Sequence, residues 1–266
     1  MKMKGETVMQ NEATVKLDCP GPGVLRLAID RPEVRNALNP QVRERLADAV
    51  DAAMRDPAVR ALILTGHGGQ FCAGGDLAGL AALPESEVGA LLQRGHRLLR
   101  VLIEGAKPVV AAVEGSAAGG GMGLALAADL VVMGRSARFV LPFFRIGLVP
   151  DYGVIWSMAR RAGPGAARRL ALLAAPVAAD QALTLGLADQ VVDDDKVQQA
   201  ALETAELLAR HPPQALAWTK RLANAQPASL AESLTSEIEA QSACFGSAAF
   251  KDGVAAFLGR RGGGRG

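Results

Sequence analysis

Phe71-Cys72-Ala73-Gly74-Gly75-Asp76-Leu77 is a glycine-rich turn that follows the apolar run 61–65. A second turn, Gly115-Ser116-Ala117-Ala118-Gly119-Gly120-Gly121-Met122-Gly123, follows the apolar run 109–113. Each pattern predicts a buried strand that leads into a loop and a short helix. Glycines let the backbone N–H groups of such loops approach a ligand closely. Two loops of this kind can direct two N–H donors at one oxygen atom, which is how an oxyanion hole is built.

Strands and helices are predicted to alternate along the rest of the chain. Strands are expected at 14–17, 24–29, 60–65, 109–113, 130–133 and 137–141, with Pro20-Gly21-Pro22-Gly23 as a turn between the first two. Helices are expected at 40–54, with Asn39 as N-cap, and at 85–103, 121–128, 194–210, 213–224, 228–244 and 249–258. A short apolar segment at 188–192 interrupts the helical second half. Strand–crossover–strand units imply a parallel sheet with helices outside it.

The composition indicates an ordinary globular enzyme. The net charge of +2 is too small to indicate a nucleic-acid partner. No uninterrupted apolar run reaches the ~20 residues of a membrane span, and the N-terminus lacks the apolar centre of a signal peptide. The three cysteines, Cys19, Cys72 and Cys244, show no metal-ligand spacing, so we expect reduced thiols, no metal and a cytoplasmic location.

Three further stretches accompany the two glycine-rich turns. They are Arg31-Pro32-Glu33-Val34-Arg35-Asn36-Ala37-Leu38-Asn39, Lys107-Pro108-Val109-Val110-Ala111-Ala112-Val113 and Gly147-Leu148-Val149-Pro150-Asp151. Together these motifs resemble the crotonase (enoyl-CoA hydratase/isomerase) family, and the resemblance runs from about residue 15 to about residue 261. It implies an α/β fold made of a spiral of ββα units, followed by a C-terminal helical oligomerisation region.

The resemblance also implies how the chain is divided. We expect a core with the acyl-CoA site over residues 12–195, a helical region for subunit packing over 196–261, and flexible tails at 1–11 and 262–266. The apolar surface of the helical region predicts a homotrimer or a dimer of trimers.

An acyl-CoA thioester is the substrate that the resemblance implies, with coenzyme A as part of that substrate and no tightly bound cofactor. The backbone N–H groups of Ala73 and Gly120 are expected to bind the thioester carbonyl. Contacts to coenzyme A are expected from Arg35, Ala37, Ala73, Gly74, Gly75, Asp76, Leu77, Phe257 and Arg260.

Two acids are missing from the predicted substrate pocket. Hydratases of this family use two glutamates, and the matching positions hold Gly123 and Phe143. Adding water to a double bond needs one group that deprotonates water and another that delivers a proton. Glycine and phenylalanine can do neither, so we expect no efficient hydration.

Asp151 is an acid at a position where the family places chemistry. It follows Pro150 as in the family's double-bond isomerases, including ring isomerases that act on 1,2-epoxyphenylacetyl-CoA. One carboxylate can remove a proton, leave an enolate in the oxyanion hole, and return the proton elsewhere. Apolar neighbours are expected to raise the pKa of Asp151. The structural alternative is that Asp151 caps the helix that begins near Tyr152.

His96 is a second candidate for the substrate pocket. The 4-chlorobenzoyl-CoA dehalogenase branch is similar at His96 and at Asp151, which is a nucleophile in that branch, but it has tryptophan where this chain has Phe143. Two alternatives therefore remain open beside the isomerase. One is a dehalogenase or hydrolase with Asp151 as nucleophile and His96 activating water, and the other is a catalytically silent acyl-CoA-binding homologue. The structural alternative, which we favour, is that His96 is a partly exposed helix residue beside Arg94 and Arg97.

Overall fold

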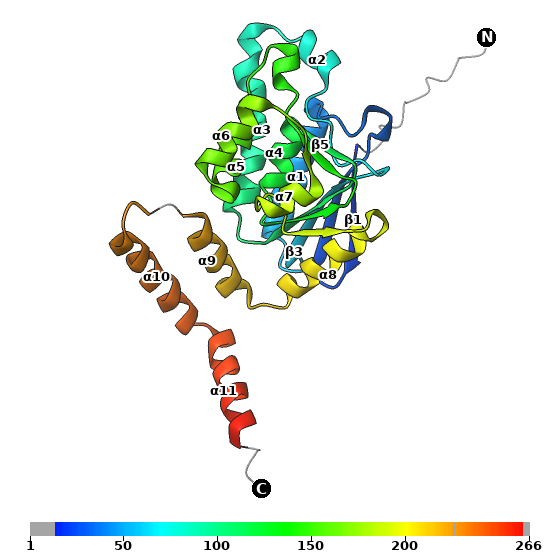
Figure 1. Ribbon diagram of the computed structural model, residues 1–266. Helices are drawn as coiled ribbons and strands as arrows, with labels where there is room; N and C mark the ends of the chain where they lie inside the picture. Colours follow the sequence, from blue (N-terminus) through cyan, green and yellow to red (C-terminus); the bar gives the residue numbers. More distant parts are fainter. Residues whose placement is uncertain (1–13, 226, 263–266) are drawn as a thin grey trace, which may run out of the picture.

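The computed structural model describes residues 14–225 and 227–262, with side chains up to residue 259. A body of sheets and helices carries most of the chain, and an arm of helices extends from it at the C-terminal end (Figure 1). Of the predicted tails, only Gly262 falls within the described residues. None of the described helices is long and apolar enough to span a membrane.

A six-stranded sheet forms the centre of the body, in the order β1-β2-β3-β4-β6-β9. Strands β1 (Val15–Gly21) and β2 (Val24–Ile29) pair antiparallel, and all later neighbours pair parallel. The parallel strands are β3 (Ala61–Gly66), β4 (Val109–Val113), β6 (Leu130–Gly134) and β9 (Gln190–Val192). Strands β3 and β4 are buried at every position, because helices cover both faces of the sheet.

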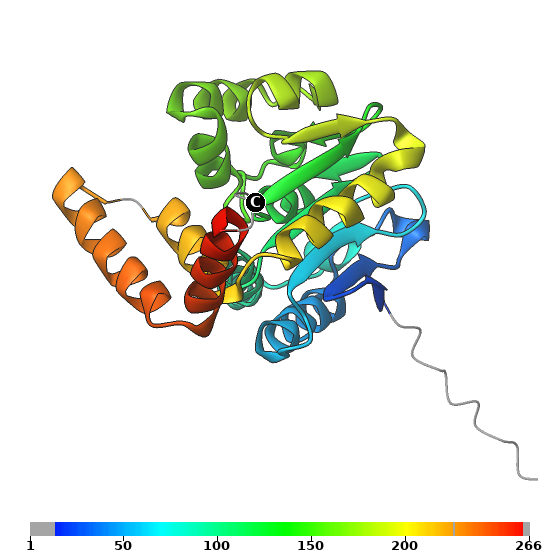
Figure 2. The same ribbon diagram turned by 90° about the horizontal axis from the view of Figure 1, so that it is seen from below.

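Alternate residues of β3 enter two separate apolar cores. Leu62 and Leu64 face the larger core, to which α1 (Pro40–Arg55) and α3 (Glu85–Glu104) contribute. Ile63 faces the smaller core under α8 (Val197–Ala209). Successive side chains of a strand point to opposite faces, so one strand serves both cores. Helix α8 thus packs as part of the body (Figure 2), and the boundary expected at residue 196 does not coincide with a change in packing.

A second, three-stranded sheet contains two strands that the sequence pattern did not predict. It consists of β5 (Ser116–Ala118), β7 (Arg138–Val140) and β8 (Val177–Ala178), with β5 and β7 parallel and β7 and β8 antiparallel. Strand β5 lies inside the second glycine-rich turn. Strands of two or three residues are too short to show a period of two, so only their partners reveal them.

Shorter elements connect these layers. The chain adds the 3-10 helices η1 (Pro32–Val34), η2 (Phe143–Ile146) and η3 (Asp194–Lys196), and the helices α2 (Leu77–Ala81), α4 (Gly120–Leu126), α5 (Val154–Ala162), α6 (Pro164–Leu173) and α7 (Ala179–Thr184). Asn39 caps α1 as expected, since its side chain accepts from the N–H of Val42. The predicted α/β fold with C-terminal helices is confirmed.

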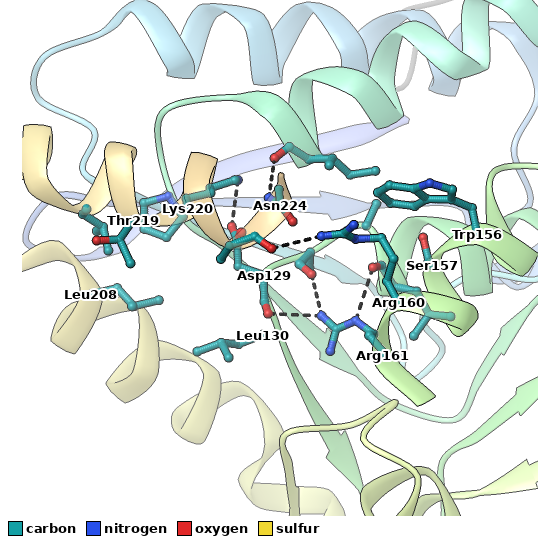
Figure 3. A pocket seen from close by; sticks show the side chains of 17 residues that line it. Asp129, Leu130, Trp156, Ser157, Arg160, Arg161, Leu208, Thr219, Lys220 and Asn224 are labelled. Carbon is teal, nitrogen blue, oxygen red and sulfur yellow. Dashed lines mark hydrogen bonds and ion pairs between the residues drawn. The ribbon is translucent and has the colours of Figure 1, made fainter. Parts of the chain in front are cut away.

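Three helices form the C-terminal arm: α9 (Pro213–Asn224), α10 (Leu230–Phe245) and α11 (Ala248–Gly262). Helix α9 lies against the body beside a cavity of about 400 Å³ (Figure 3). The Lys220 ammonium lies 2.8 Å from the Asp129 carboxylate, and Asn224 donates to the Ile103 carbonyl. Asp129 also accepts from the N–H of Val109 at the start of β4. These contacts join α9 to the body, while α10 and α11 project away from it (Figures 1 and 2).

Candidate active site

The two glycine-rich turns meet at the edge of the body. The N–H of Leu38 donates to the Gly74 carbonyl at 2.7 Å, and the N–H of Ala118 donates to the Cys72 carbonyl at 2.9 Å. Gly74 has φ +89°, and a Cβ there would lie 2.7 Å from the Ala118 carbonyl oxygen and 3.2 Å from the Gly120 nitrogen. Only glycine allows the two turns to approach this closely.

The N–H of Ala73 is not available to a ligand. It donates to the Arg35 carbonyl at 2.9 Å, which corrects the expectation that Ala73 supplies an oxyanion-hole donor. The left-handed φ of Gly74 turns the chain between Ala73 and Gly75. Within the described residues, the N–H groups of Gly75 and Gly120 have no backbone acceptor, and both residues line one pocket. Gly120 is the first residue of α4, where an N–H has no partner inside the helix.

This pocket is a cavity of about 240 Å³ between the two turns, α3 and η2. Its wall is mainly apolar, as expected for a small-molecule site with few polar groups. The polar side chains among the described lining residues are Arg43, Arg145, Asp151 and Tyr152. Phe143 lines the pocket as predicted, together with Leu77, Leu80, Leu91, Leu92, Ile146 and Leu148.

Asp151 is the carboxylate of this pocket and is half-buried. Burial raises the pKa of Asp151 above its ordinary value, while Arg43, a hydrogen bond from its own backbone N–H, and His96 act in the opposite direction. The side chain does not cap a helix: Gly153 is the N-cap of α5, and the N–H of Val154 donates to the backbone carbonyl of Asp151 at 3.1 Å. The carboxylate is therefore not committed to a structural role at the start of α5.

Gly123 lies behind Tyr152 and is not one of the described residues that line the pocket, contrary to expectation. A Cβ at Gly123 would lie 2.7 Å from the Tyr152 Cβ and closer still to the Tyr152 carbonyl oxygen. The segment after Asp151 thus fills the space that a longer side chain at Gly123 would need.

His96 is an exposed residue of α3, and the pocket's described lining does not include it. It is nevertheless near enough to Asp151 to lower the pKa of that carboxyl. His96 therefore acts electrostatically on Asp151 but is not among the described residues that line the cavity.

The residues expected to contact coenzyme A lie in two separate places. Asp76 pairs with Arg31 at 3.1 Å, and Arg31 also donates to the Ala37 carbonyl at 2.8 Å. Arg31, which the sequence motif contained without a role, thus ties the segment of Ala37 to the first turn. At the surface near these contacts, Arg35 and Leu77 are exposed.

Phe257 lies on α11, and this helix is at the end of the molecule opposite to α2 in Figure 1, so Phe257 does not reach the pocket within this chain. The side chain of Arg260 lies outside the described residues.

The Cys72 thiol is a potentially reactive group in the first glycine-rich turn, but it is fully buried. Burial raises the pKa of the Cys72 thiol to about 12, so this thiol stays protonated at neutral pH. Among the described residues, no group of three or more His, Cys, Asp or Glu side chains could hold a metal ion. The chemistry of the pocket therefore centres on one carboxylate and two backbone N–H groups.

The chain is similar in sequence and in fold to enoyl-CoA hydratases and isomerases. A family model described as enoyl-CoA hydratase/isomerase matches residues 21–263. The 1,2-epoxyphenylacetyl-CoA isomerase of Escherichia coli (strain K12) is 39% identical over 244 residues, covering 90% of this chain and 93% of its own. The crotonyl-CoA hydratase of Syntrophomonas wolfei is 35% identical over 240 residues, covering 88% and 91%. The crystal structure of an enoyl-CoA hydratase from Bacillus anthracis has a TM-score of 0.89 at 27% identity, covering 93% of this chain and 97% of that one.

Proposed function

Since the chain belongs to the enoyl-CoA hydratase/isomerase family, we propose that it shifts a double bond in an acyl-CoA thioester, with Asp151 as the single acid and base. The observation that carries this proposal is the content of the pocket. One carboxylate, Asp151, shares the pocket with two N–H groups, those of Gly75 and Gly120, that have no backbone acceptor among the described residues.

The proposed reaction has two proton transfers. Asp151 removes a proton from a carbon next to the double bond, and the electron pair moves onto the thioester oxygen as an enolate. The N–H groups of Gly75 and Gly120 stabilise the negative oxygen. The protonated Asp151 then delivers its proton to another carbon, which completes the shift. A partly desolvated carboxylate is a stronger base than one in water, so the raised pKa of Asp151 supports this role.

Hydration is disfavoured because the described residues that line the pocket include no second acid. Phe143 lines the wall, and Gly123 is shut off behind Tyr152. The similar proteins include hydratases as well as an isomerase. Overall sequence similarity therefore does not distinguish hydration from isomerisation. The isomerase of E. coli supports an epoxide or enoyl isomerisation as the reaction class.

A test of this proposal compares Asp151→Asn with the parent enzyme on 3-hexenoyl-CoA, following formation of the conjugated 2-enoyl thioester. We expect the isomerisation rate to fall by ~10²-fold or more, because an amide cannot accept the proton. Binding of the thioester should change little. Asp195→Asn, at an exposed position, is the matched control and should keep full activity. Full activity of Asp151→Asn would exclude this residue as the base.

A second candidate function is hydrolysis or dehalogenation with Asp151 as nucleophile. The observation in its favour is that His96 is near enough to influence Asp151 electrostatically. Mass spectrometry of the protein after incubation with 4-chlorobenzoyl-CoA would detect an acyl or aryl adduct on Asp151. Such an adduct favours this function. Binding of acyl-CoA with no turnover of either substrate would favour a silent homologue.

A further inference from the structure

Arg43 is a buried arginine in the wall of the acyl-CoA pocket that the proposed reaction does not use. It lies in α1 and is 5% exposed. Its Nε donates to the Leu38 carbonyl at 3.2 Å, and its Nη1 donates to the Tyr152 hydroxyl. The guanidinium also lies 5.0 Å from the centre of the Tyr152 ring, in a cation–π arrangement. Among the described residues, no carboxylate forms an ion pair with Arg43. Buried arginines are usually paired, so Arg43 is unusual.

Tyr152, the partner of Arg43, directly follows the proposed base. It is 1% exposed and has φ +51°, a left-handed conformation that is uncommon for a residue with a Cβ. Two glycines make room for it. A Cβ at Gly95 would lie 2.6 Å from Tyr152 Cζ, and one at Gly123 would lie 2.7 Å from Tyr152 Cβ, whereas one at Gly120 would make only an ordinary contact with the ring at 3.4 Å. Gly95 of α3 and Gly123 of α4 thus leave the space that Tyr152 fills, directly next to Asp151 in the chain.

The charge of Arg43 acts on Asp151 as well. Of the influences that lower the pKa of Asp151 against its burial, Arg43 is the largest. Among the described residues, other charged or titratable groups near this carboxylate are His96 on α3, Tyr152, and Arg145, which lines the same pocket from η2. Burial raises the pKa of the Tyr152 phenol to about 12, so Tyr152 is neutral at working pH. A neutral Tyr152 does not offset the positive charge of Arg43. This charge can therefore act on Asp151 while the guanidinium donates a hydrogen bond to the Tyr152 hydroxyl.

We propose that Arg43 and Tyr152 are positioning residues for Asp151, with Arg43 anchoring the Tyr152 side chain and supplying a buried positive charge in the pocket that it shares with the carboxylate. This inference rests on the proposed role of Asp151 as the base. Helix α1 thus contributes to the reaction through Arg43, which positions Asp151 and transfers no proton itself.

The electrostatic half of the proposal is tested by titration of Asp151 in protein labelled with ¹³C at aspartate carboxyls. The Asp151 signal is the one absent from Asp151→Asn, so the measurement needs no substrate. Arg43→Gln should raise the pKa of Asp151, because it removes the positive charge. Arg43→Lys should leave this pKa near the parent value. Arg45→Gln removes an exposed charge from the same helix and should have no effect. An unchanged pKa in Arg43→Gln would overturn this half.

The positional half is tested by the kinetics of Tyr152→Phe on 3-hexenoyl-CoA. This variant keeps the ring in the space left by the two glycines and loses only the hydroxyl that Arg43 contacts. A displacement of about 1 Å at a reacting group can lower a rate by ~10²-fold, so we expect kcat to fall by up to this factor. KM should change little, because neither side chain is expected to contact coenzyme A. If Arg43→Gln fails to fold, Arg43→Met, which also removes the charge, replaces it in the titration, and Tyr152→Phe still decides the positional half.

Two results separate this inference from the proposed function. Parent values of kcat in Tyr152→Phe and Arg43→Gln, together with an inactive Asp151→Asn, would overturn the positioning role and leave Asp151 as the base. Full activity of Asp151→Asn would overturn the proposed function itself.

Discussion

At the scale of the residue, the catalytic role proposed for Asp151 comes with a cost in the stability of the fold. Its pKa is raised by burial, so the folded chain binds the proton more tightly than the unfolded chain. Ionising such a group disfavours the folded state. This cost is absent below the unfolded pKa of ~3.9 and is fully present above the folded pKa.

Asp151→Asn should therefore raise the thermal midpoint at pH 7 while it removes isomerase activity. The amide carries no charge that burial would penalise, and its size is nearly the same. The gain should shrink as the pH falls towards ~4, where Asp151 of the parent enzyme becomes protonated. Thermal unfolding of both proteins between pH 4 and pH 8 checks this expectation. A lower midpoint at pH 7 would show that the carboxylate stabilises the fold.

The pH dependence of activity follows from the same shift. A base must be ionised, and a raised pKa means that Asp151 loses its charge at a higher pH than an exposed aspartate does. We expect the acid limb of kcat/KM for 3-hexenoyl-CoA to lie above ~3.9, the ordinary pKa of aspartate. A limb at or below that value would contradict the desolvated position of Asp151.

Substitutions at Gly123 test whether the structure has room for the glutamate that hydratases of the family carry at this position. Exchanging Gly123 and Phe143 for glutamate would place both hydratase acids in the sequence, but the Tyr152 backbone occupies the space beside Gly123. Gly123→Ala alone should destabilise the protein by about 1–3 kcal/mol through overpacking. Gly89→Ala on α3, where a Cβ meets open space, is the matched control and should be neutral or slightly stabilising.

The double change Gly123→Glu with Phe143→Glu should consequently leave crotonyl-CoA hydration at the low rate of the parent. That parent rate should be several orders of magnitude below a two-glutamate enzyme, since each acid or base supplies ~10²–10⁴-fold. Rapid hydration by the parent, measured from loss of enoyl absorbance, would contradict the single-acid pocket.

At the scale of the element, the ion pair between Lys220 and Asp129 is one of the contacts that join α9 to the body. Lys220 Nζ donates to the carbonyls of Leu102 and Lys107 in addition to the Asp129 carboxylate. Burial raises the pKa of Asp129 and lowers that of Lys220, while their mutual attraction opposes both shifts. Such a pair tolerates the loss of both charges better than the loss of one.

Lys220→Met should destabilise the protein by about 3–5 kcal/mol, because it leaves Asp129 buried without its partner. Adding Asp129→Asn should recover part of this loss, since the amide oxygen can still accept from the N–H of Val109. Both tryptophans, Trp156 on α5 and Trp218 on α9, lie near this contact or on the helix itself. Tryptophan fluorescence during chemical unfolding therefore reports on it. Equal stability of the single and double variants would show that the charges are not coupled.

At the scale of the whole molecule, the arm leaves apolar side chains in solvent. Leu230, Leu234 and Ile238 lie on one face of α10 and are 74%, 48% and 68% exposed. Phe245, Phe250 and Phe257 continue the exposed apolar surface towards and along α11. A monomer rarely exposes so much contiguous apolar surface, so the homotrimer or dimer of trimers stays our prediction.

Leu234→Glu combined with Ile238→Glu should shift the assembly to smaller species, because charges do not fit an apolar interface. Light scattering coupled to gel filtration at micromolar concentration gives the mass directly. Thr235→Glu, between the two positions in sequence and exposed, is the control and should assemble normally. A monomeric parent protein would exclude the trimer.

The features that could be predicted from the amino-acid sequence are mostly local ones, such as the bounds of helices and strands. Apolar periodicity placed β2, β4, α1 and α3 to within a residue or two, because neighbours along the chain set these elements. The motifs also indicated the family and the turns that carry the site.

Tertiary structure alone decided which groups are free to act. The N–H of Ala73 donates to the Arg35 carbonyl, a contact between segments distant in the chain, so we propose Gly75 as the donor in its place. Tyr152 fits inside the protein because Gly95 and Gly123, from two different helices, leave space for it. Arg43 gives no signal in the sequence beyond its place on the inner face of a helix. Hydrogen-bond partners and burial depend on which segments pack together, and that is a property of the folded chain.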